Sequence, residues 1–513
     1  MKMNLMQRQV VSIIVISTFI RIVLALLLEL GNDEVYYWTY ARYPDFSHFD
    51  HPPMIGLLIQ ASTLNLLFSD DFFLRLGPIV LAACSTWMMY RIGTKVKDER
   101  AGLVAAILFT ASIYCSLIAG FAVVPDAPQL FFWLLALDVM LDFLPAENIG
   151  SRQRTRMIMF GVFAGLAMLS KYHSAFLWVG VLSYILCYNR KWMKDYSLYG
   201  ALAISFLLIT PILYWNFTND FITFTFHGSR VKPDFQFRPD YFIQEIAGQI
   251  AYNNPINCVL IIMALLGLAR KKMLLDSSIR ILLLNSLPLY FLFTGFSLFR
   301  STLPHWTGPS FLAMIVIAAV YWSSHVVSDE KRLFLPLSIR LSLFFVLVMS
   351  CLAVYGINYV PFSFGTQTEE AHAGDGDFTQ DMFGWESIGK DFQAIALKEE
   401  RTGRMQPGAA LISYRWYPGA HEDYYVAMHR NLYVLGELND THKYFWINQQ
   451  RGGLQAGKDY YHIAVSNYYR DPETVFGGVF ERIEPIDTIN VFRSGALVRK
   501  AFVYRLRNYT GSL

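Results

Sequence analysis

The sequence predicts a mainly α-helical, polytopic membrane protein with about eleven spanning helices and a C-terminal extramembrane α/β domain. Residues of the AVILMFWYC set make up 54% of the 513 residues and charged residues only 16%, whereas soluble domains usually carry about 25% charged residues. The mean hydropathy is +0.33. The net charge of +3 is too small to indicate a nucleic-acid partner.

The apolar residues gather in runs long enough to cross a bilayer, which needs about 17–25 residues per helix. We expect spans at 10–30, 75–94, 101–121, 128–144, 157–171, 174–189, 197–215, 254–270, 279–298, 304–325 and 333–357. The first is too long for a signal peptide, and we expect it to stay in place. The run 54–68 is short, which favours a helix at the interface or tucked against the bundle.

Basic residues mark every second connection between these spans, which predicts the orientation by the positive-inside rule. The clusters are Lys2 and Arg8; Arg91, Lys95, Lys97 and Arg100; Arg152, Arg154 and Arg156; Arg190, Lys191 and Lys194; Arg270, Lys271, Lys272 and Arg280; and Lys331 and Arg332. With eleven spans, this pattern predicts a multi-pass protein whose N-terminus is cytoplasmic and whose C-terminal domain lies outside, in the periplasm or its equivalent.

The composition changes after the last span, and we expect a domain boundary there. Residues 1–358 form the predicted membrane module, with a periplasmic first loop at 31–74, and residues 359–513 form a periplasmic α/β domain. The segments GAALISY, YFWIN, YYHIAVSN and NVFRSG are typical of short strands. Helices are expected at 387–399 and 420–430.

The first outward loop begins with two acids. Asp33 and Glu34 follow the first span directly and precede Tyr36, Tyr37 and Trp38. A carboxylate at a membrane surface beside aromatic rings fits a general base next to a sugar or lipid platform. The alternative is an interfacial aromatic belt with incidental acids.

The same loop continues with His48-Phe49-Asp50-His51-Pro52-Pro53. Imidazole and carboxylate groups at this density can bind a divalent metal or relay protons. His227, in the later outward loop, is a candidate to join Asp50 at such a metal. The alternative is a structured turn with capping side chains, and a structural role for His227.

Three further candidates lie at outward helix ends. Asp126 stands between Pro125 and Pro128 at the start of the fourth span, where an isolated acid needs a partner or a function; a helix cap is the alternative. Lys171 ends the fifth span beside Tyr172, a cation and a phenol suited to a lipid-linked phosphate; snorkelling to the interface is the alternative. Arg300 adds a cation, and His305 an imidazole, near the tenth span.

The sequence has no Walker loop, no GxGxxG and no HExxH in a meaningful context. A cytoplasmic nucleotide-sugar site is therefore not predicted. An outward site fits a donor sugar carried on a polyprenyl phosphate within the membrane. We expect Asp33, Asp126 and Lys171 to converge in one pocket at the outer membrane boundary.

In this order, Asp33-Glu34, Phe49-Asp50-His51-Pro52-Pro53, Pro125-Asp126-Ala127-Pro128, Ser170-Lys171-Tyr172 and Leu303-Pro304-His305-Trp306 resemble the motifs of GT-C membrane glycosyltransferases. The most similar subgroup is the protein-mannosyltransferase-like family, which includes the lipid A aminoarabinose transferase. The resemblance covers about residues 10–325, with a looser match in the tail, and it implies a multi-pass protein of a bacterial inner membrane.

The resemblance implies inverting transfer of a hexose or pentose from a polyprenyl-phosphate sugar to an envelope glycolipid (lipid A or lipopolysaccharide), another glycan or a protein. It matches Asp33 to the catalytic first-loop acid, with Glu34 beside it, and Asp126 to the second acidic position. Lys171, Tyr172, Arg300 and His51 are then expected at the donor phosphate. Asp50 and His227 stand where the family can hold a metal, although Asp50 replaces a Glu and His51 replaces a Lys of the aminoarabinose enzyme.

Two other functions compete with this interpretation. A transporter or flippase of lipid-linked saccharides is the first alternative, but carriers tend to show internal repeats and broken midplane helices, and no repeat is visible here. A membrane scaffold that presents the C-terminal domain is the second, and it leaves the ordered acidic and basic positions unexplained.

Overall fold

The computed structural model describes residues 3–231, 236–270, 276–328, 333–366 and 369–511, without the side chains of 229–231 and 328. Contacts divide the chain into two compact units. The first unit is Met1–Val23 with Pro44–Met349, and the second is Leu24–Tyr43 with Ser350–Leu513. The start of the predicted first loop thus packs with the C-terminal residues. The domain boundary at 358 stays a prediction.

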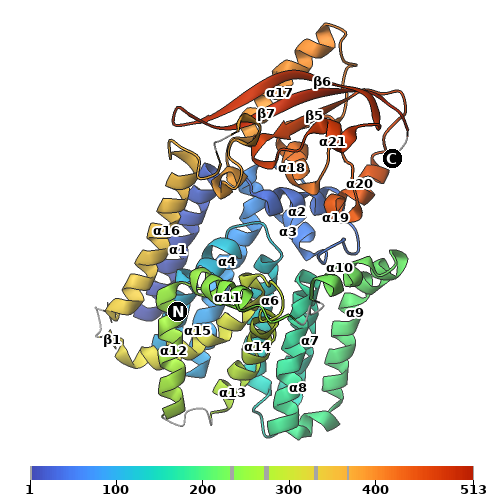
Figure 1. The fold of residues 1–513 in the computed structure, drawn as a ribbon. Coiled ribbons are helices and arrows are strands. Elements are labelled where there is room, and N and C mark those ends of the chain that lie inside the picture. The colour runs from blue at the N-terminus through green and yellow to red at the C-terminus, as the bar shows by residue number, and fades with distance from the viewer. Residues whose placement is uncertain (1–2, 232–235, 271–275, 329–332, 367–368, 512–513) are drawn as a thin grey trace. The chain divides into compact units, whose positions relative to one another are not determined.

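The first unit is helical (Figure 1). Its helices are α1 (Leu5–Leu27, whose end lies in the second unit), α3 (Met54–Ser62), α4 (Asp71–Val96), α5 (Glu99–Ala111), α6 (Asp126–Phe143), α7 (Ser151–Ser170), α8 (Phe176–Tyr188), α9 (Tyr196–Thr218), α10 (Ile222–Val231), α11 (Pro239–Tyr252), α12 (Pro255–Arg270), α13 (Ser277–Leu284), α14 (Leu287–Phe296), α15 (Gly308–Trp322) and α16 (Leu337–Asn358, which also ends in the second unit). The two-residue strands β1 (Val327–Ser328) and β2 (Leu333–Phe334) pair in antiparallel orientation.

Every predicted span overlaps one helix or a run of consecutive helical segments, and the last also includes β2. Among the described residues, six helices are long and apolar enough to cross a membrane, and a seventh results if α11 and α12, bent by 99° at their junction, form one span. The number eleven stays a prediction, because several of the predicted spans are short or charged. α5 has 13 residues, and α6 carries Asp126, Asp138 and Asp142.

The centre of the first unit is α15, which is apolar on all sides and buried from Gly308 to Val320. A helix without a polar face is typical of a core position. It packs against α5 and α12, and α6 and α9 pack against α7. The run 54–68 forms the short helix α3, which contacts α4, α6 and α7 and is therefore tucked against the bundle.

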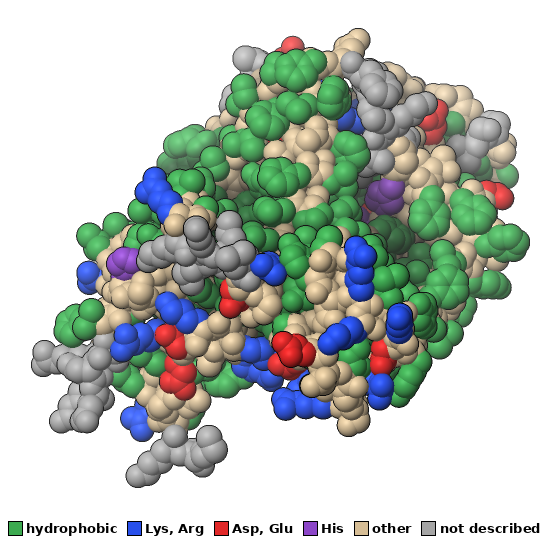
Figure 2. Space-filling view, turned by 90° about the horizontal axis from the view of Figure 1, so that it is seen from below, with side chains coloured by type: hydrophobic (Ala, Val, Ile, Leu, Met, Phe, Trp, Pro, Cys, Tyr) green, Lys and Arg blue, Asp and Glu red, His purple; other side chains and the backbone are tan. Residues whose placement is uncertain are grey.

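Basic side chains gather at one end of these helices. Lys95 Nζ lies 2.8 Å from Asp138 Oδ1 and 3.0 Å from Asp142 Oδ1, and Arg156 Nε lies 3.4 Å from Asp142 Oδ2, which joins α4, α6 and α7. Figure 2, seen from below, shows Lys and Arg side chains over this face with carboxylates among them. The predicted clusters at 271–272 and 331–332 lie outside the described residues.

The second unit is built on a five-stranded sheet with the order β4-β3-β5-β7-β6 (Figure 1). The strands are β3 (Leu411–Ser413), β4 (Leu432–Val434), β5 (Tyr460–Val465), β6 (Phe480–Arg493) and β7 (Ala496–Tyr509). β3 pairs in parallel with β4 and β5, while β7 is antiparallel to β5 and β6. The β6–β7 hairpin turns at Ser494 and Gly495, both at positive φ, as a two-residue hairpin of this twist requires.

The helices of this unit are α2 (Asn32–Arg42), α17 (Trp385–Arg401), α18 (Trp416–His421), α19 (Leu438–Thr441), α20 (Tyr444–Gln450) and α21 (Pro472–Phe476). The expected helix at 387–399 is confirmed by α17. The expected helix at 420–430 continues from α18 through a π-helical turn only as far as Val426. GAALISY, YYHIAVSN and NVFRSG contain strand residues as predicted.

The strand predicted at YFWIN is wrong, because these residues form α20. Tyr444 and Ile447 are the buried positions, and their spacing of three is that of a helix face. Asn448 also bonds the edge strand β4 through its side chain, donating to Val434 O at 2.7 Å and accepting from Val434 N at 3.1 Å. An aromatic-rich segment of five residues carries both periodicities, and tertiary contacts decide between them.

Candidate active site

Asp126 and Lys171 form a buried ion pair in the first unit. Lys171 Nζ donates to Asp126 Oδ2 at 2.8 Å, and 3% of Asp126 and 6% of Lys171 are exposed. Because the interior strengthens the attraction between opposite charges but makes an unpaired charge costly, the two side chains depend on each other. The structure thus brings together two residues that sequence analysis singled out independently.

The helix ends explain why these charges lie here. Asp126 is the first residue of α6, where the helix dipole favours a negative charge, and Lys171 directly follows α7, where it favours a positive one. A second contact holds the two ends together, because Gln129 Nε2 donates to Ser174 Oγ at 2.8 Å. Both residues of the pair are therefore positioned by rigid helix ends.

Tyr114 completes the environment of Asp126, and sequence analysis missed it. Its hydroxyl donates to Asp126 Oδ1 at 2.7 Å, so both carboxylate oxygens accept a hydrogen bond. Tyr114 is fully buried and begins a π-helical turn, Tyr114–Ile118, after α5. Such turns are frequent at functional sites. Its position in an apolar run, next to no other ionisable motif, left no signal in the sequence.

The turn at residues 47–51 packs against α10. His51 Nδ1 lies 3.0 Å from Asp50 Oδ2, and His227 Nε2 lies 2.6 Å from the main-chain oxygen of Asp50. The rings of His51 and His227 are 6.2 Å apart. Asp50, His51 and His227, which are far apart in the sequence, therefore form one cluster.

Tyr172 connects this cluster to the ion pair. It follows Lys171 in the chain, its ring centroid is 5.6 Å from that of His227, and its hydroxyl lies 3.4 Å from Ser47 Oγ. The short helical turn Tyr172–Ala175 therefore carries Lys171 at its entry and Tyr172 against the 47–51 turn. Six of the predicted residues (Asp50, His51, Asp126, Lys171, Tyr172 and His227) lie in one connected region of the first unit.

The donor set for a metal is incomplete in the part of the chain that the structure describes. That part has no group of three or more His, Cys, Asp or Glu residues that could hold a metal ion. His227 is hydrogen-bonded to the main-chain oxygen of Asp50, whereas the Asp50 carboxylate is hydrogen-bonded to His51. The predicted divalent metal at Asp50 and His227 thus stays a prediction, and we derive no chemical step from it.

Arg300 lies in the first unit just after α14 and is half-buried. Its main-chain N–H bonds the oxygen of Phe296, which continues the last turn of that helix. Its predicted contact with a donor phosphate stays a prediction.

Asp33 and Glu34 lie in the second unit, in the first turn of α2, and the structure assigns them different situations. Glu34 is buried, and its Oε2 accepts the main-chain N–H of Gly31 at 2.9 Å, which caps the start of the helix. Asp33 is exposed. Because Asp33 belongs to a different unit from Asp126 and Lys171, its convergence with them stays a prediction.

Asp381 joins these acids, and no sequence motif indicated it. Its Oδ1 accepts the main-chain N–H of Asn32 at 3.0 Å. Burial, with the charges of Asp33 and Glu34 nearby, raises the pKa of Asp381 to about 7. The start of α2 is thus surrounded by three carboxyl groups, one of which titrates near neutral pH.

The aromatic residues of α2 do not form an exposed platform. Tyr36, Tyr37 and Trp38 are all buried. The ring of Tyr36 lies 4.9 Å from that of Trp416, and the ring of Trp38 lies 5.2 Å from that of Tyr424. They anchor α2 in the second unit, and Asp33 is the group that remains at the surface.

Comparisons with known proteins bear on this arrangement. The model of the dolichyl-phosphate-mannose-protein mannosyltransferase family matches residues 50–215, a range that contains Asp126, Lys171 and Tyr172. A curated relative, the lipid A galacturonosyltransferase RgtD of Rhizobium johnstonii, is 25% identical over 195 residues, 37% of this chain. The matched part spans 38% of that relative's length.

The fold has solved counterparts. The crystal structure of ArnT from Cupriavidus metallidurans in the apo state superposes with a TM-score of 0.63 at 13% identity, covering 97% of both chains. The structure of ArnT bound to undecaprenyl phosphate gives 0.61 at 13% identity, covering 96% of this chain and 97% of that one. These superpositions confirm the predicted fold class. Together with the fold, the family-model match and the curated relative confirm the resemblance to GT-C membrane glycosyltransferases.

Proposed function

We propose that this protein is an integral membrane glycosyltransferase. It transfers a sugar from a polyprenyl-phosphate donor to an envelope acceptor, which is a glycolipid such as lipid A, another glycan or a protein, on the periplasmic side of a bacterial inner membrane. The observation that carries the proposal is the buried Lys171–Asp126 pair held by Tyr114. The fold and the family match support it.

Lys171 is proposed to hold the donor phosphate. An ammonium group has three donors, and one of them bonds Asp126 in the described structure. The other two are proposed to contact the phosphate oxygens, whose negative charge grows as the bond to the sugar breaks. Tyr172 and His51, in the same connected region, and Arg300 are proposed to add hydrogen bonds to that phosphate.

The proposed reaction is a single displacement with inversion. A hydroxyl oxygen of the acceptor attacks the anomeric carbon, the carbon–oxygen bond to the phosphate breaks, and the lipid phosphate leaves with the electron pair. Asp33 is proposed to accept the proton of the hydroxyl as a general base. Asp33 is an exposed residue in the first turn of α2.

Asp126 and Glu34 have supporting parts in this proposal. Asp126 accepts bonds from both Tyr114 and Lys171, so it orients the Lys171 ammonium and balances its charge between turnovers. Glu34 caps α2 and thereby fixes the helix turn that carries Asp33. Neither role requires Glu34 or Asp126 to receive the proton.

A transfer assay tests the proposal. The purified protein in nanodiscs is incubated with radiolabelled undecaprenyl-phosphate hexoses, hexuronic acids and pentoses, together with envelope glycolipid or envelope protein. We expect a labelled product from at least one donor, its loss in Asp33→Asn, and a decrease of about 100-fold in Lys171→Met, as for other lost charge-stabilising donors. Lys95→Met, which removes a different paired lysine, is expected to retain activity.

The outcomes separate the candidate functions. Full activity in Asp33→Asn would refute the role of Asp33 as base. Movement of a lipid-linked saccharide across the bilayer without a labelled product would favour a flippase. An active alkaline phosphatase fused after Leu513 is expected if the C-terminal domain is periplasmic, and an inactive fusion would contradict the proposed orientation.

A further inference from the structure

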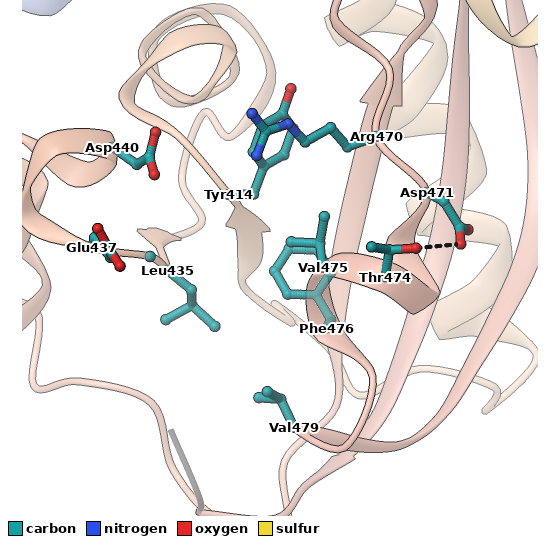
Figure 3. Close-up of a pocket in the computed structure, with 11 residues that line it drawn as sticks. Tyr414, Leu435, Glu437, Asp440, Arg470, Asp471, Thr474, Val475, Phe476 and Val479 are labelled. Carbon is teal, nitrogen blue, oxygen red and sulfur yellow. Dashed lines mark hydrogen bonds between the residues drawn. The ribbon is translucent and has the colours of Figure 1, made fainter.

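The second unit contains a cavity of about 500 Å³ at the carboxyl ends of two parallel strands (Figure 3). Tyr414 directly follows β3 and Leu435 directly follows β4, and both line the cavity. Open α/β sheets commonly bind ligands outside the carboxyl ends of parallel strands, and the size lies within the range of about 300–1,000 Å³ for small-molecule sites. Position and size therefore both indicate a ligand site.

The walls of the cavity differ in chemistry. Figure 3 shows Leu435 and Glu437 on one side and Val475, Phe476 and Val479 on the other. The Arg470 guanidinium lies over the Tyr414 ring, 5.1 Å from its centroid. The cavity therefore offers apolar side chains together with one guanidinium (Arg470) and the carboxylates of Glu437, Asp440 and Asp471.

Of these charged groups, Glu437 and Arg470 are the best placed to bind a ligand. Asp440 pairs with Arg415 at 2.9 Å, and Asp471 accepts a bond from Thr474 Oγ1 at 3.0 Å. Among the described residues, Glu437 forms neither an ion pair nor a side-chain hydrogen bond, and Arg470 contacts the Tyr414 ring without an acidic partner. They are also exposed, so their charges are solvated until a ligand enters.

We propose that this cavity binds a neutral or amino-bearing saccharide ring. A pyranose has an apolar C–H face, which fits the half-buried Val475 and Val479, and hydroxyl groups that both donate and accept, which fit Glu437 and Arg470. The lining disfavours an anionic ligand such as a phosphate or a uronate, because it has three carboxylates (Glu437, Asp440 and Asp471) and one guanidinium. An acyl chain would desolvate Glu437 and Arg470 without compensation.

This inference rests on the proposed function and specifies it: the saccharide is part of the acceptor, so the acceptor carries a carbohydrate. The cavity residues belong to the second unit, whereas Lys171, which is proposed to hold the donor phosphate, belongs to the first. Altering the cavity should weaken acceptor binding and leave donor binding unchanged.

The test uses the full chain in nanodiscs and saturation-transfer NMR with methyl β-glucoside, glucosamine, galacturonate and a tri-alanine peptide as probes. We expect signal from one or both of the first two sugars, at least fivefold weaker signal from galacturonate, and background signal from the peptide. Thr474→Trp places an indole at the lining, and Glu437→Gln removes the carboxylate charge. Each is expected to weaken saccharide binding at least tenfold.

Matched controls come from Glu473, the residue before Thr474, because it lies in the same helix α21, is exposed and does not line the cavity. Glu473→Trp and Glu473→Gln are expected to bind like the wild type, and thermal unfolding verifies that all variants fold. Equal binding in wild type, Thr474→Trp and Glu437→Gln, no sugar binding at all, or preferred binding of the peptide or galacturonate would overturn the proposal.

Lys171→Met distinguishes the two proposals. It is expected to lose sugar transfer and to keep saccharide binding at the cavity. If the wild type shows saccharide binding that Thr474→Trp removes, but transfers no sugar from any donor, the cavity assignment stands and the transferase proposal fails.

Discussion

The ring of Tyr114 occupies the space that a side chain at Gly308 would fill. A Cβ at residue 308 would lie 2.1 Å from Tyr114 Cζ and 2.5 Å from its hydroxyl oxygen, the same hydroxyl that bonds Asp126. The first residue of the central helix α15 is thereby coupled to the proposed donor phosphate site. The absence of a side chain at Gly308 allows Tyr114 to reach Asp126.

Gly308→Ala should therefore impair transfer without unfolding the protein. Overpacking typically costs about 1–3 kcal/mol, and displacement of Tyr114 should reduce the transfer rate at least tenfold because Asp126 loses one of its two bonds. Transfer kinetics and thermal unfolding measure the two effects. Gly295→Ala is the control, since nothing lies within 4 Å of a Cβ there. An unchanged rate in Gly308→Ala would contradict the coupling.

Removing one member of the Asp126–Lys171 pair should destabilise more than removing both charges. Lys171→Met leaves the Asp126 carboxylate buried without its cation, which typically costs about 3–5 kcal/mol. The double variant Asp126→Asn with Lys171→Met should recover much of that loss, although it stays inactive. A double-mutant cycle by thermal unfolding in nanodiscs measures the coupling. Additive effects of the two single variants would show that the pair is not coupled.

Asp381→Asn should stabilise the second unit at alkaline pH. Burial raises the pKa of Asp381 from 3.8 to about 7, so the folded state binds the proton more tightly than the unfolded chain. Below about pH 4, Asp381 therefore does not lower the free energy of unfolding. Ionisation of Asp381 imposes a penalty on that free energy, which develops between pH 4 and 7 and is complete above pH 7. That penalty is at most about 4 kcal/mol.

Thermal unfolding at pH 4.5, 6 and 8 checks this prediction. The gain in stability of the variant over the wild type should be largest at pH 8 and small at pH 4.5. The amide oxygen of the new Asn can still accept the Asn32 N–H. Asp487→Asn, an exposed change in β6, is the control. A gain that does not depend on pH would contradict the raised pKa.

Glu34 should tolerate replacement by Gln but not by Ala. The amide oxygen of Gln can accept the Gly31 N–H as the carboxylate does at 2.9 Å, whereas loss of a cap typically costs about 0.5–2 kcal/mol. Glu34→Gln should retain near-normal transfer, and Glu34→Ala should lower both stability and rate. Complete loss of transfer in Glu34→Gln, with folding intact, would instead make Glu34 a catalytic acid or base.

Some site residues were visible in the sequence because of their surroundings. Asp126 and Lys171 are ionisable residues at the ends of apolar runs. Because a charged side chain is energetically costly within a membrane, such positions indicate a function. Tyr114 is one of 30 tyrosines, and an apolar neighbourhood is ordinary for that residue. Asp381 lies in a polar segment rich in acids, so nothing local distinguished it from Asp375 or Asp377.

The sequence by itself determined where the helices lie and which charges are unusual, because hydrophobic runs, prolines and isolated ionic groups act locally. Only the tertiary structure decided that Lys171 meets Asp126 across 45 residues, that Asp381 meets the start of α2 across 349, and that YFWIN is a helix. Contacts at such separations depend on how packed helices and strands fill space and satisfy buried polar groups. No local pattern in the chain encodes that outcome.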